Sequence, residues 1–143
     1  MKWVTREHVH VDRVACPWLI KNFIDKDAEF FFVPRDTDPN TIIVGIPFDM
    51  KGVELGHQGE ECSFDALIKK YNLSNDLALV KLQEIVRLAD TSRGNENPLS
   101  YSLDVIATGY RLNSDSDYLT LEREFHLYEA LYSYFKQTST INP

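Results

Sequence analysis

A glycine-rich segment of this chain carries two residues whose types and spacing suit metal binding. Glu54 and His57 lie three positions apart on it. A carboxylate and a neutral imidazole together suit Zn²⁺, Mn²⁺ or Fe²⁺ as a bound cofactor. Two ligands are too few for a metal site. A polar loop whose histidine bonds a backbone carbonyl gives the same pattern, so both interpretations stay open on the spacing alone.

Asp90 is the third candidate metal ligand. It shares one face of a predicted helix with a stripe of apolar residues, which indicates partial burial. It also lies near the C-terminal end of that helix, where the helix dipole disfavours a negative charge. A carboxylate in such a place needs a partner. That partner is a metal ion, or one of two arginines, Arg13 and Arg87.

Arg6 and Arg13 are the candidates for binding an oxyanion. The planar guanidinium group can donate two parallel hydrogen bonds to an oxyanion. Arg13 also lies near a predicted helix start, where unpaired backbone N–H groups favour anions. Ordinary salt bridges are the alternative, because the chain has 22 acidic residues against 15 basic ones.

Asp12, Cys16 and Cys62 are further candidates for the same pocket. Asp12 is expected to cap the helix that follows it by accepting a backbone N–H. Cys16 would be reactive if the helix start and Arg13 lowered its pKa. Free cysteine is often only a small buried residue, and this second interpretation is favoured. The two cysteines do not by themselves form a zinc-binding pattern.

The elements that must position these residues are short strands and a helix, followed by a loop. Strands are expected at residues 2–5, 29–33 and 41–44. A helix is expected over residues 12–25, starting at Arg13 with a kink or only at Pro17. Residues 45–62 contain four of the six glycines and are expected to form an irregular loop. Polar loops on a rigid scaffold are frequent binding sites.

Four helices are expected after residue 63, from apolar residues at helical spacing. Their expected starts are Ser63, Ser74 or Asn75, Pro98 after an Asn97 cap, and Asp115 or Ser116. Two stripes are expected to face the core, namely Leu99, Leu103, Ile106 and Tyr110, and then Leu121, Phe125, Tyr128, Tyr132 and Phe135. The predicted fold is a single α+β domain over residues 1–143, with a small short-stranded N-terminal sheet and a helical C-terminal half.

Composition argues against two classes of binding partner, nucleic acids and membranes. A net charge of −7 and the absence of any long Lys/Arg cluster argue against direct nucleic-acid binding. No apolar signal region opens the chain, and no stretch approaches the ~20 apolar residues of a membrane span. A cytoplasmic protein without a membrane partner is therefore expected. A homo-oligomer stays open.

Six segments along the chain carry a resemblance to a known family. They are Asp12-Arg-Val-Ala-Cys-Pro-Trp-Leu-Ile20, Ala28-Glu-Phe-Phe-Phe-Val33, Glu54-Leu-Gly-His57, Cys62-Ser-Phe-Asp65, Ile85-Val-Arg-Leu-Ala-Asp90 and Leu127-Tyr-Glu-Ala-Leu-Tyr132. Together they resemble the C-terminal domain of the chromate-resistance protein ChrB, over nearly the whole chain. The resemblance implies a bacterial domain of chromate-resistance systems, in some cases part of a chromate-responsive regulator.

The leading hypothesis is a ChrB-like sensor or accessory domain that binds a metal ion or an oxyanion. Its polar pocket would join the 12–16 turn, the 54–62 loop and the end of the helix that carries Asp90. The alternative is a metal-dependent redox or hydrolytic enzyme that uses His57 and nearby carboxylates. An interaction module without a ligand is the third possibility. Both the sensor and the enzyme hypothesis predict that His57 and Asp90 lie close in space to Asp12 or Arg13.

Overall fold

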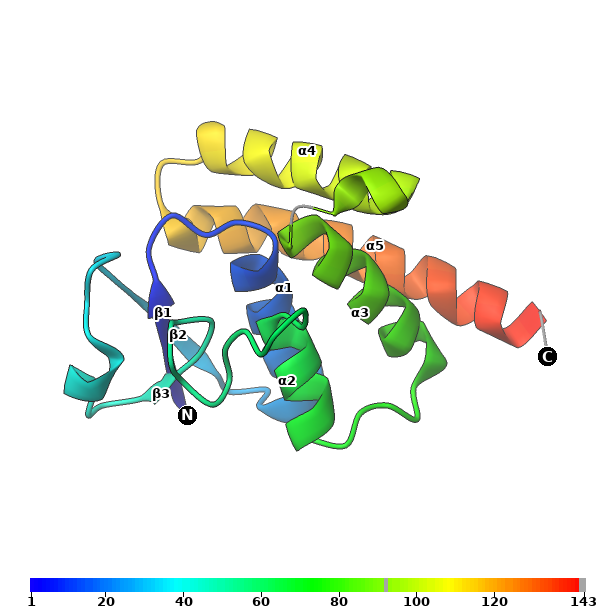
Figure 1. Cartoon of the computed structure of the whole chain (residues 1–143). Helices are drawn as coiled ribbons and strands as arrows, with labels where there is room; N and C mark the ends of the chain where they lie inside the picture. The colour runs from blue at the N-terminus through cyan, green and yellow to red at the C-terminus, as the bar shows by residue number, and fades with distance from the viewer. Residues whose placement is uncertain (92, 142–143) are drawn as a thin grey trace.

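A small parallel sheet lies at one end of the molecule, beside helices formed mostly by the second half of the chain (Figure 1). The computed structural model describes residues 1–91 and 93–141. Within them, β1 (Lys2–Arg6) is the central strand, between β2 (Glu29–Val33) and β3 (Ile46–Pro47), and both neighbours are parallel to it. This arrangement confirms the predicted α+β class.

The register of β1 with β2 explains why an aromatic-rich segment forms a strand. Trp3 pairs with Phe30 and Thr5 pairs with Phe32, so these four side chains share one face of the sheet. Trp3 and Thr5 are fully buried, and the two phenylalanines are half-buried and pack on the core. Parallel neighbours need a long crossover connection, and a helical segment supplies it here.

That crossover is α1 (Asp12–Leu19), followed by a π-helical turn over Ile20–Ile24. The helix begins at Asp12, one residue before the earlier of the two predicted starts, and Pro17 lies inside it. In the π turn the Asp25 N–H donates to the Ile20 carbonyl at 2.7 Å. The predicted helical extent, residues 12–25, is thus nearly all helical, in two forms.

The predicted strand at 41–44 is wrong. Pro39–Thr41 forms a 3₁₀ turn instead, and β3 begins only at Ile46. Ile43 and Val44 are β-branched, which favours a strand, but they are 90% and 69% exposed and pair with nothing in the sheet. The chain reaches β1 at Gly45, where a Cβ atom would lie 2.9 Å from the Lys2 carbonyl oxygen.

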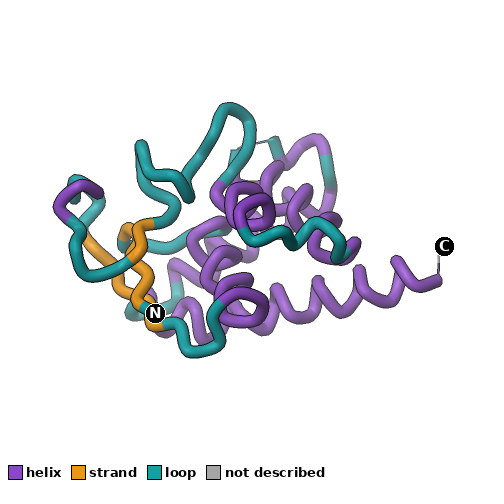
Figure 2. Tube along the Cα trace, turned by 90° about the horizontal axis from the view of Figure 1, so that it is seen from below, coloured by secondary structure: helices purple, strands orange, loops and turns teal. Residues whose placement is uncertain are grey.

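The four α-helices that the structure describes after residue 62 begin close to their predicted starts. They are α2 (Ser63–Lys70), α3 (Leu77–Asp90), α4 (Pro98–Leu112) and α5 (Asp117–Ile141), with a 3₁₀ turn at Gly94–Glu96. Asp76 caps α3, and Asn97 caps α4 before Pro98 as predicted. Figure 2 shows α5 running away from the strands and their loops toward the C-terminus.

The predicted apolar stripe of α5 is confirmed, whereas that of α4 is wrong in part. In α5, Leu121, Tyr128 and Phe135 are buried, and Phe125 and Tyr132 pack against the core, as predicted.

In α4 the prediction is wrong for Leu99 and Ile106, which are 42% and 40% exposed. The buried face of this helix is Ser100, Leu103 and Ala107. The Ser100 hydroxyl donates to the Ile85 carbonyl of α3, so a small residue allows the close approach of the two helices.

No helix among the described residues is long and apolar enough to cross a membrane. The cytoplasmic location and the homo-oligomer stay predictions.

Candidate metal centre

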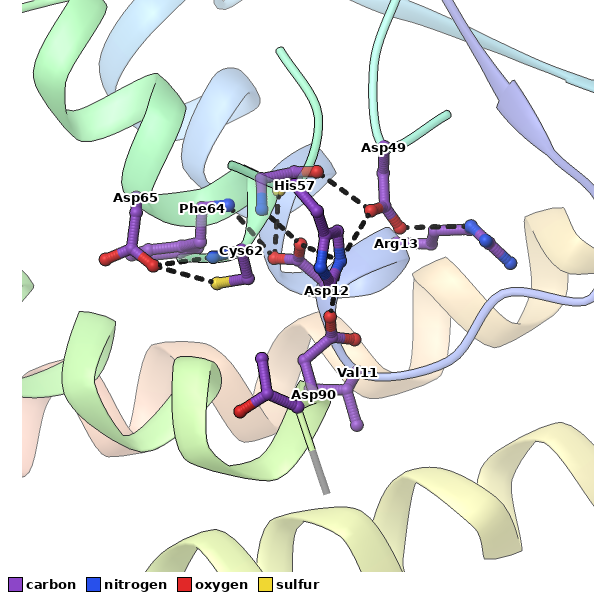
Figure 3. A network of polar contacts seen from close by, with 12 residues as sticks. Val11, Asp12, Arg13, Asp49, His57, Cys62, Phe64, Asp65 and Asp90 are labelled. Carbon is purple, nitrogen blue, oxygen red and sulfur yellow. Dashed lines mark hydrogen bonds and ion pairs between the residues drawn. The ribbon is translucent and has the colours of Figure 1, made fainter. Parts of the chain in front are cut away.

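Three carboxylates lie around one imidazole at the start of α1 (Figure 3). His57 Nε2 lies 2.8 Å from the Asp90 carboxylate, 3.3 Å from Asp49 and 4.0 Å from Asp12. One ligand atom from each of Asp12, Asp49 and His57 lies within 4.8 Å of the other two. We call Asp12, Asp49, His57 and Asp90 the carboxylate–histidine cluster. The predicted convergence of Asp12, His57 and Asp90 is therefore present in the structure.

Asp12 lies at the bottom of the cluster and is fully buried. Its carboxylate accepts from the N–H groups of Ser63 and Phe64, at 2.7 and 3.1 Å, and from the Cys16 thiol at 3.2 Å. Asp12 thus caps α2, and the prediction that it caps its own helix is wrong. The reason is that the N-terminal ends of α1 and α2 meet here, and the free N–H groups of α2 attract an anion.

Asp12 has too little positive charge near it to balance its own negative charge and those of the neighbouring carboxylates. Burial, together with the negative charges of Asp49 and Asp90, raises the pKa of Asp12 well above its ordinary value. The hydrogen bonds from Cys16 and Ser63 oppose this shift without cancelling it. A cation among the three carboxylates would remove the repulsion between them.

Asp49 follows β3 and begins the loop that returns over the cluster. Its carboxylate bonds the Ser63 hydroxyl at 2.8 Å and pairs with Arg13 at 3.0 Å. Burial alone would raise the pKa of Asp49, but His57, Arg13 and Ser63 together hold it below its ordinary value. The Asp49 N–H donates to the Leu55 carbonyl, which closes the loop.

Asp90 is the last residue of α3, and its side chain is 14% exposed, so the predicted partial burial is confirmed. Its partner is His57, and neither of the two arginines considered from the sequence pairs with it. Arg87 points to Asp65, a buried carboxylate at the start of α2 that accepts two of its N–H groups. Arg13 is held by the carboxylate that follows β3.

His57 is protonated at neutral pH while the cluster is free of metal. Its hydrogen bonds to Asp49 and Asp90 raise its pKa to about 10, against the opposing effect of burial. The side chain is still 45% exposed, so it faces solvent on one side. A metal ion that used His57 as a ligand would have to displace this proton.

The two cysteines are buried and free. Burial raises the pKa of Cys16 well above its ordinary value, and the nearby charges of Asp12 and Asp49 raise it further. Burial also raises the pKa of Cys62, again with help from Asp12. Both therefore stay thiols, which confirms the favoured interpretation of Cys16 as a small buried residue.

Glu54 lies outside the cluster, although it was predicted to share a metal with His57. Its side chain is 74% exposed and pairs with Lys70 at 3.1 Å, on the wall of a different cavity. The loop turns between Glu54 and His57 at Gly56, where a Cβ atom would lie 2.7 Å from the Met50 carbonyl oxygen. Three residues of spacing bring two side chains together on a helix, but not on this loop.

An open cavity of about 500 Å³ lies beside the cluster. Asp49, His57 and Asp90 line it, together with Arg6 and Arg13, the two predicted oxyanion ligands. None of the other basic residues of the wall was predicted to belong to the site, namely His8, His10, Arg35, Lys51 and Arg111. The His10 side chain is only 27% exposed and lies 3.1 Å from an Asp104 carboxylate oxygen.

One signal could have found Arg35, which follows the end of the predicted strand at 29–33 by two residues, where a parallel sheet gathers ligand-binding residues. Asp49 follows β3 in the same way, but the strand predicted before it ended at residue 44.

Comparison with known proteins now decides the family. Residues 3–135 match the family model of the ChrB C-terminal domain. The chain belongs to this family. Protein ChrB of Cupriavidus metallidurans is 30% identical over 134 residues, which cover 94% of this chain and 40% of that relative. Family membership is consistent with an association with chromate resistance.

The chain spans less than half the length of that curated relative, so the activity of a whole ChrB protein is not transferred to it. The search of solved structures found no match. The function must therefore be argued from the site itself.

Proposed function

We propose that this ChrB-type domain binds one divalent metal ion, Mn²⁺, Fe²⁺ or Zn²⁺, and acts as a metal-binding sensor or accessory domain in chromate resistance. The observation that carries the proposal is the carboxylate–histidine cluster itself. Three carboxylates, one of them fully buried, approach a single histidine nitrogen to within 4.0 Å. Carboxylates gather in this way around a cation, because their mutual repulsion otherwise raises the free energy of the folded state.

The donor set supports this class of metal. Three carboxylates and one imidazole mix the oxygen ligands that suit Mn²⁺ with the nitrogen ligand that suits Zn²⁺ and Fe²⁺. The ligand atoms of Asp12, Asp49 and His57 are already within 4.8 Å of one another. Metal–ligand bonds of about 2.0–2.2 Å therefore require only short movements of these side chains. The hydrogen bonds from Ser63 to Asp12 and Asp49 orient both carboxylates.

A second candidate function, from a different class, is a metal-dependent redox or hydrolytic enzyme. The observation that favours it is the open cavity on which Asp49, His57 and Asp90 lie. A metal held there has a side that faces solvent, and an open coordination position is typical of catalytic sites.

Metal titration tests the proposal. The chelator-treated full chain is titrated with Mn²⁺, Zn²⁺ and, without oxygen, Fe²⁺, and binding is followed by calorimetry. We expect one ion per chain, and Asp49→Asn should weaken binding by about tenfold or more, since the amide is neutral and a poorer ligand. Asp27→Asn, an exposed carboxylate outside the cluster, is the matched control and should bind like the wild type.

Two results would contradict the proposal: no stoichiometric binding of any of the three ions, or equal affinity in wild type and Asp49→Asn. A urea unfolding curve of each variant shows whether the fold is intact. Hydrolysis or reduction of a substrate by the metal-loaded domain, lost in Asp49→Asn, would favour the enzyme over the sensor.

A further inference from the structure

The cavity beside the carboxylate–histidine cluster has a positively charged wall. Its cationic side chains are Arg6, Arg13, Arg35, Lys51 and Arg111. The chain as a whole has a net charge of −7, so this wall departs from its average composition. The wall also carries three carboxylates, Glu7, Asp49 and Asp90, so its cationic side chains exceed its acidic ones by five to three. An excess of positive charge on a concave surface concentrates anionic ligands.

In the part of the chain that the structure describes, three of the wall's arginines have no ion-pair partner. Among the described residues, no carboxylate lies within ion-pair distance of Arg6, Arg35 or Arg111. Arg13, the fourth arginine of the wall, pairs with Asp49. The Arg6 Nε atom is buried, and no hydrogen-bond acceptor is found for it in the described part of the chain. A buried donor without an acceptor costs free energy that a bound anion would recover.

The topology places these groups on a rigid base. Arg6 is the last residue of β1, Arg35 follows the end of β2 by two residues, and Asp49 follows β3 in the same way. Because the three strands are parallel, their carboxyl ends share one edge of the sheet. Ligands of open α/β sheets bind at this edge. The arginines and three residues of the carboxylate–histidine cluster therefore line the same cavity.

The size of the cavity indicates what the anion is attached to. About 500 Å³ lies within the range of pockets that hold small organic molecules, roughly 300–1,000 Å³. A bare tetrahedral oxyanion would contact only part of this wall. The arginines supply paired donors for a phosphate group, and Met50, Gly52 and His10 line the remainder of the space.

We propose that this cavity binds a small organic phosphate, a phosphomonoester, whose phosphate group lies between Arg6, Arg35 and Arg111 and the cation of the cluster. The inference rests on the proposed function, because the cation neutralises Asp49 and Asp90, which otherwise repel an anion from the same wall. Cation and phosphate therefore bind with positive coupling, and each raises the affinity of the other.

Calorimetry with ribose 5-phosphate tests the inference, with ribose and inorganic phosphate as the comparison ligands. The full chain is titrated once with saturating metal and once with chelator. We expect ribose 5-phosphate to bind at least about tenfold more tightly with metal than without it, ribose not to bind, and inorganic phosphate to bind more weakly.

Arg111→Gln should weaken the binding of ribose 5-phosphate by about tenfold, because a charged hydrogen-bond donor is lost. Arg123→Gln is the matched control: Arg123 donates to the Asn113 carbonyl and is not part of the cavity. Both positions are exposed, so neither change should disturb folding.

The outcomes separate the two proposals. Stoichiometric metal binding without any binding of ribose 5-phosphate overturns the phosphate site and leaves the metal site standing. Binding that depends on Arg111 in the absence of any metal binding supports the arginine side of the phosphate site, and it overturns both the metal site and the coupling between cation and phosphate. Equal affinity for ribose 5-phosphate and inorganic phosphate overturns the organic part of the inference, and the ligand is then a free oxyanion.

Discussion

In the metal-free protein, His57 is an imidazolium between the carboxylates of Asp49 and Asp90. Its proton takes the place of the positive charge that a metal would bring, which keeps the cluster together without a metal. The same proton competes with the metal for the ring nitrogen. At the scale of single residues, the proposed function therefore means that the site would exchange a proton for a cation.

This competition gives a pH prediction for the stability of the metal-free protein. The pKa of His57 is about 10 when folded and 6.5 in its ordinary state, so the stabilisation it provides is complete below about pH 6.5. It is lost as the pH rises through 10. The urea midpoint of the wild type, measured with chelator, should exceed that of His57→Gln most at pH 6, and the difference should vanish near pH 10.

The size of that difference is about 1 kcal/mol, since solvent screens a side chain that is nearly half exposed. His126→Gln, an exposed histidine on α5, should show no such trend and is the control. A difference between wild type and His57→Gln that stays constant from pH 6 to 10 would show that His57 is not protonated in the cluster. If the cluster binds a metal as proposed, metal affinity should rise with pH, because the proton that competes for His57 is lost.

At the scale of elements, the loop from Phe48 to Cys62 decides which of its side chains reach the cluster. It holds Asp49 at a positive φ of 47° and turns tightly before His57. Val11, which precedes Asp12, also has a positive φ, of 40°, which is unusual for a β-branched residue. Strained backbone of this kind is found at functional sites and is maintained by the packing around it.

Gly56→Ala tests how closely the site depends on this loop. The new Cβ would lie 2.7 Å from the Met50 carbonyl oxygen and 3.2 Å from that of Val53, so the backbone must move. We expect a loss of about 1–3 kcal/mol in the free energy of unfolding. We also expect metal affinity to fall by about tenfold or more, because Asp49 and His57 flank the displaced segment.

Gly109→Ala in α4 is the matched substitution at an open position, since no atom lies within 4 Å of its added Cβ. It should raise the free energy of unfolding by about 0.5–1 kcal/mol, because alanine favours the helix, and leave metal binding unchanged. Both variants are compared by urea unfolding and metal titration. Unaltered metal affinity in Gly56→Ala would show that the loop tolerates movement without losing the site.

At the scale of the whole molecule, one buried carboxyl group lies where α5 contacts the rest of the core. Glu124 is fully buried, and among the described residues neither of its carboxylate oxygens has a hydrogen-bond partner. Burial raises its pKa to about 8. The nearby Tyr128 hydroxyl donates instead to the Val11 carbonyl, next to the strained start of α1. Glu124 is therefore neutral in the folded protein at pH 7.

This neutral carboxyl predicts a pH-dependent cost to global stability. Unfolding lets Glu124 ionise, so its cost is absent below about pH 4.5, grows as the pH rises, and is complete above pH 8. Glu124→Met removes the polar group at similar volume. It should raise the free energy of unfolding at pH 8 by roughly 1–4 kcal/mol, and by much less at pH 4. Urea unfolding at the two pH values measures this difference, and an equal gain at both would contradict it.

The sequence by itself determined the family and the elements that depend on local patterns. Strands 2–5 and 29–33, the Asn97–Pro98 helix start and the stripe of α5 follow from residue types that favour one backbone state or bury one face. His57, Asp90 and Arg13 could be singled out because their chemistry and position are visible locally. The strand at 41–44 failed because β-branched residues favour a strand only where another strand is there to pair with them.

Only the tertiary structure decided which side chains share the site. Asp12 caps α2 across a separation of 51 residues, Asp49 joins the cluster, and Glu54 leaves it for Lys70. These outcomes depend on how segments pack that are distant in the sequence. A local pattern gives the chemistry of a side chain, but its partner and its pKa come from neighbours that folding brings together.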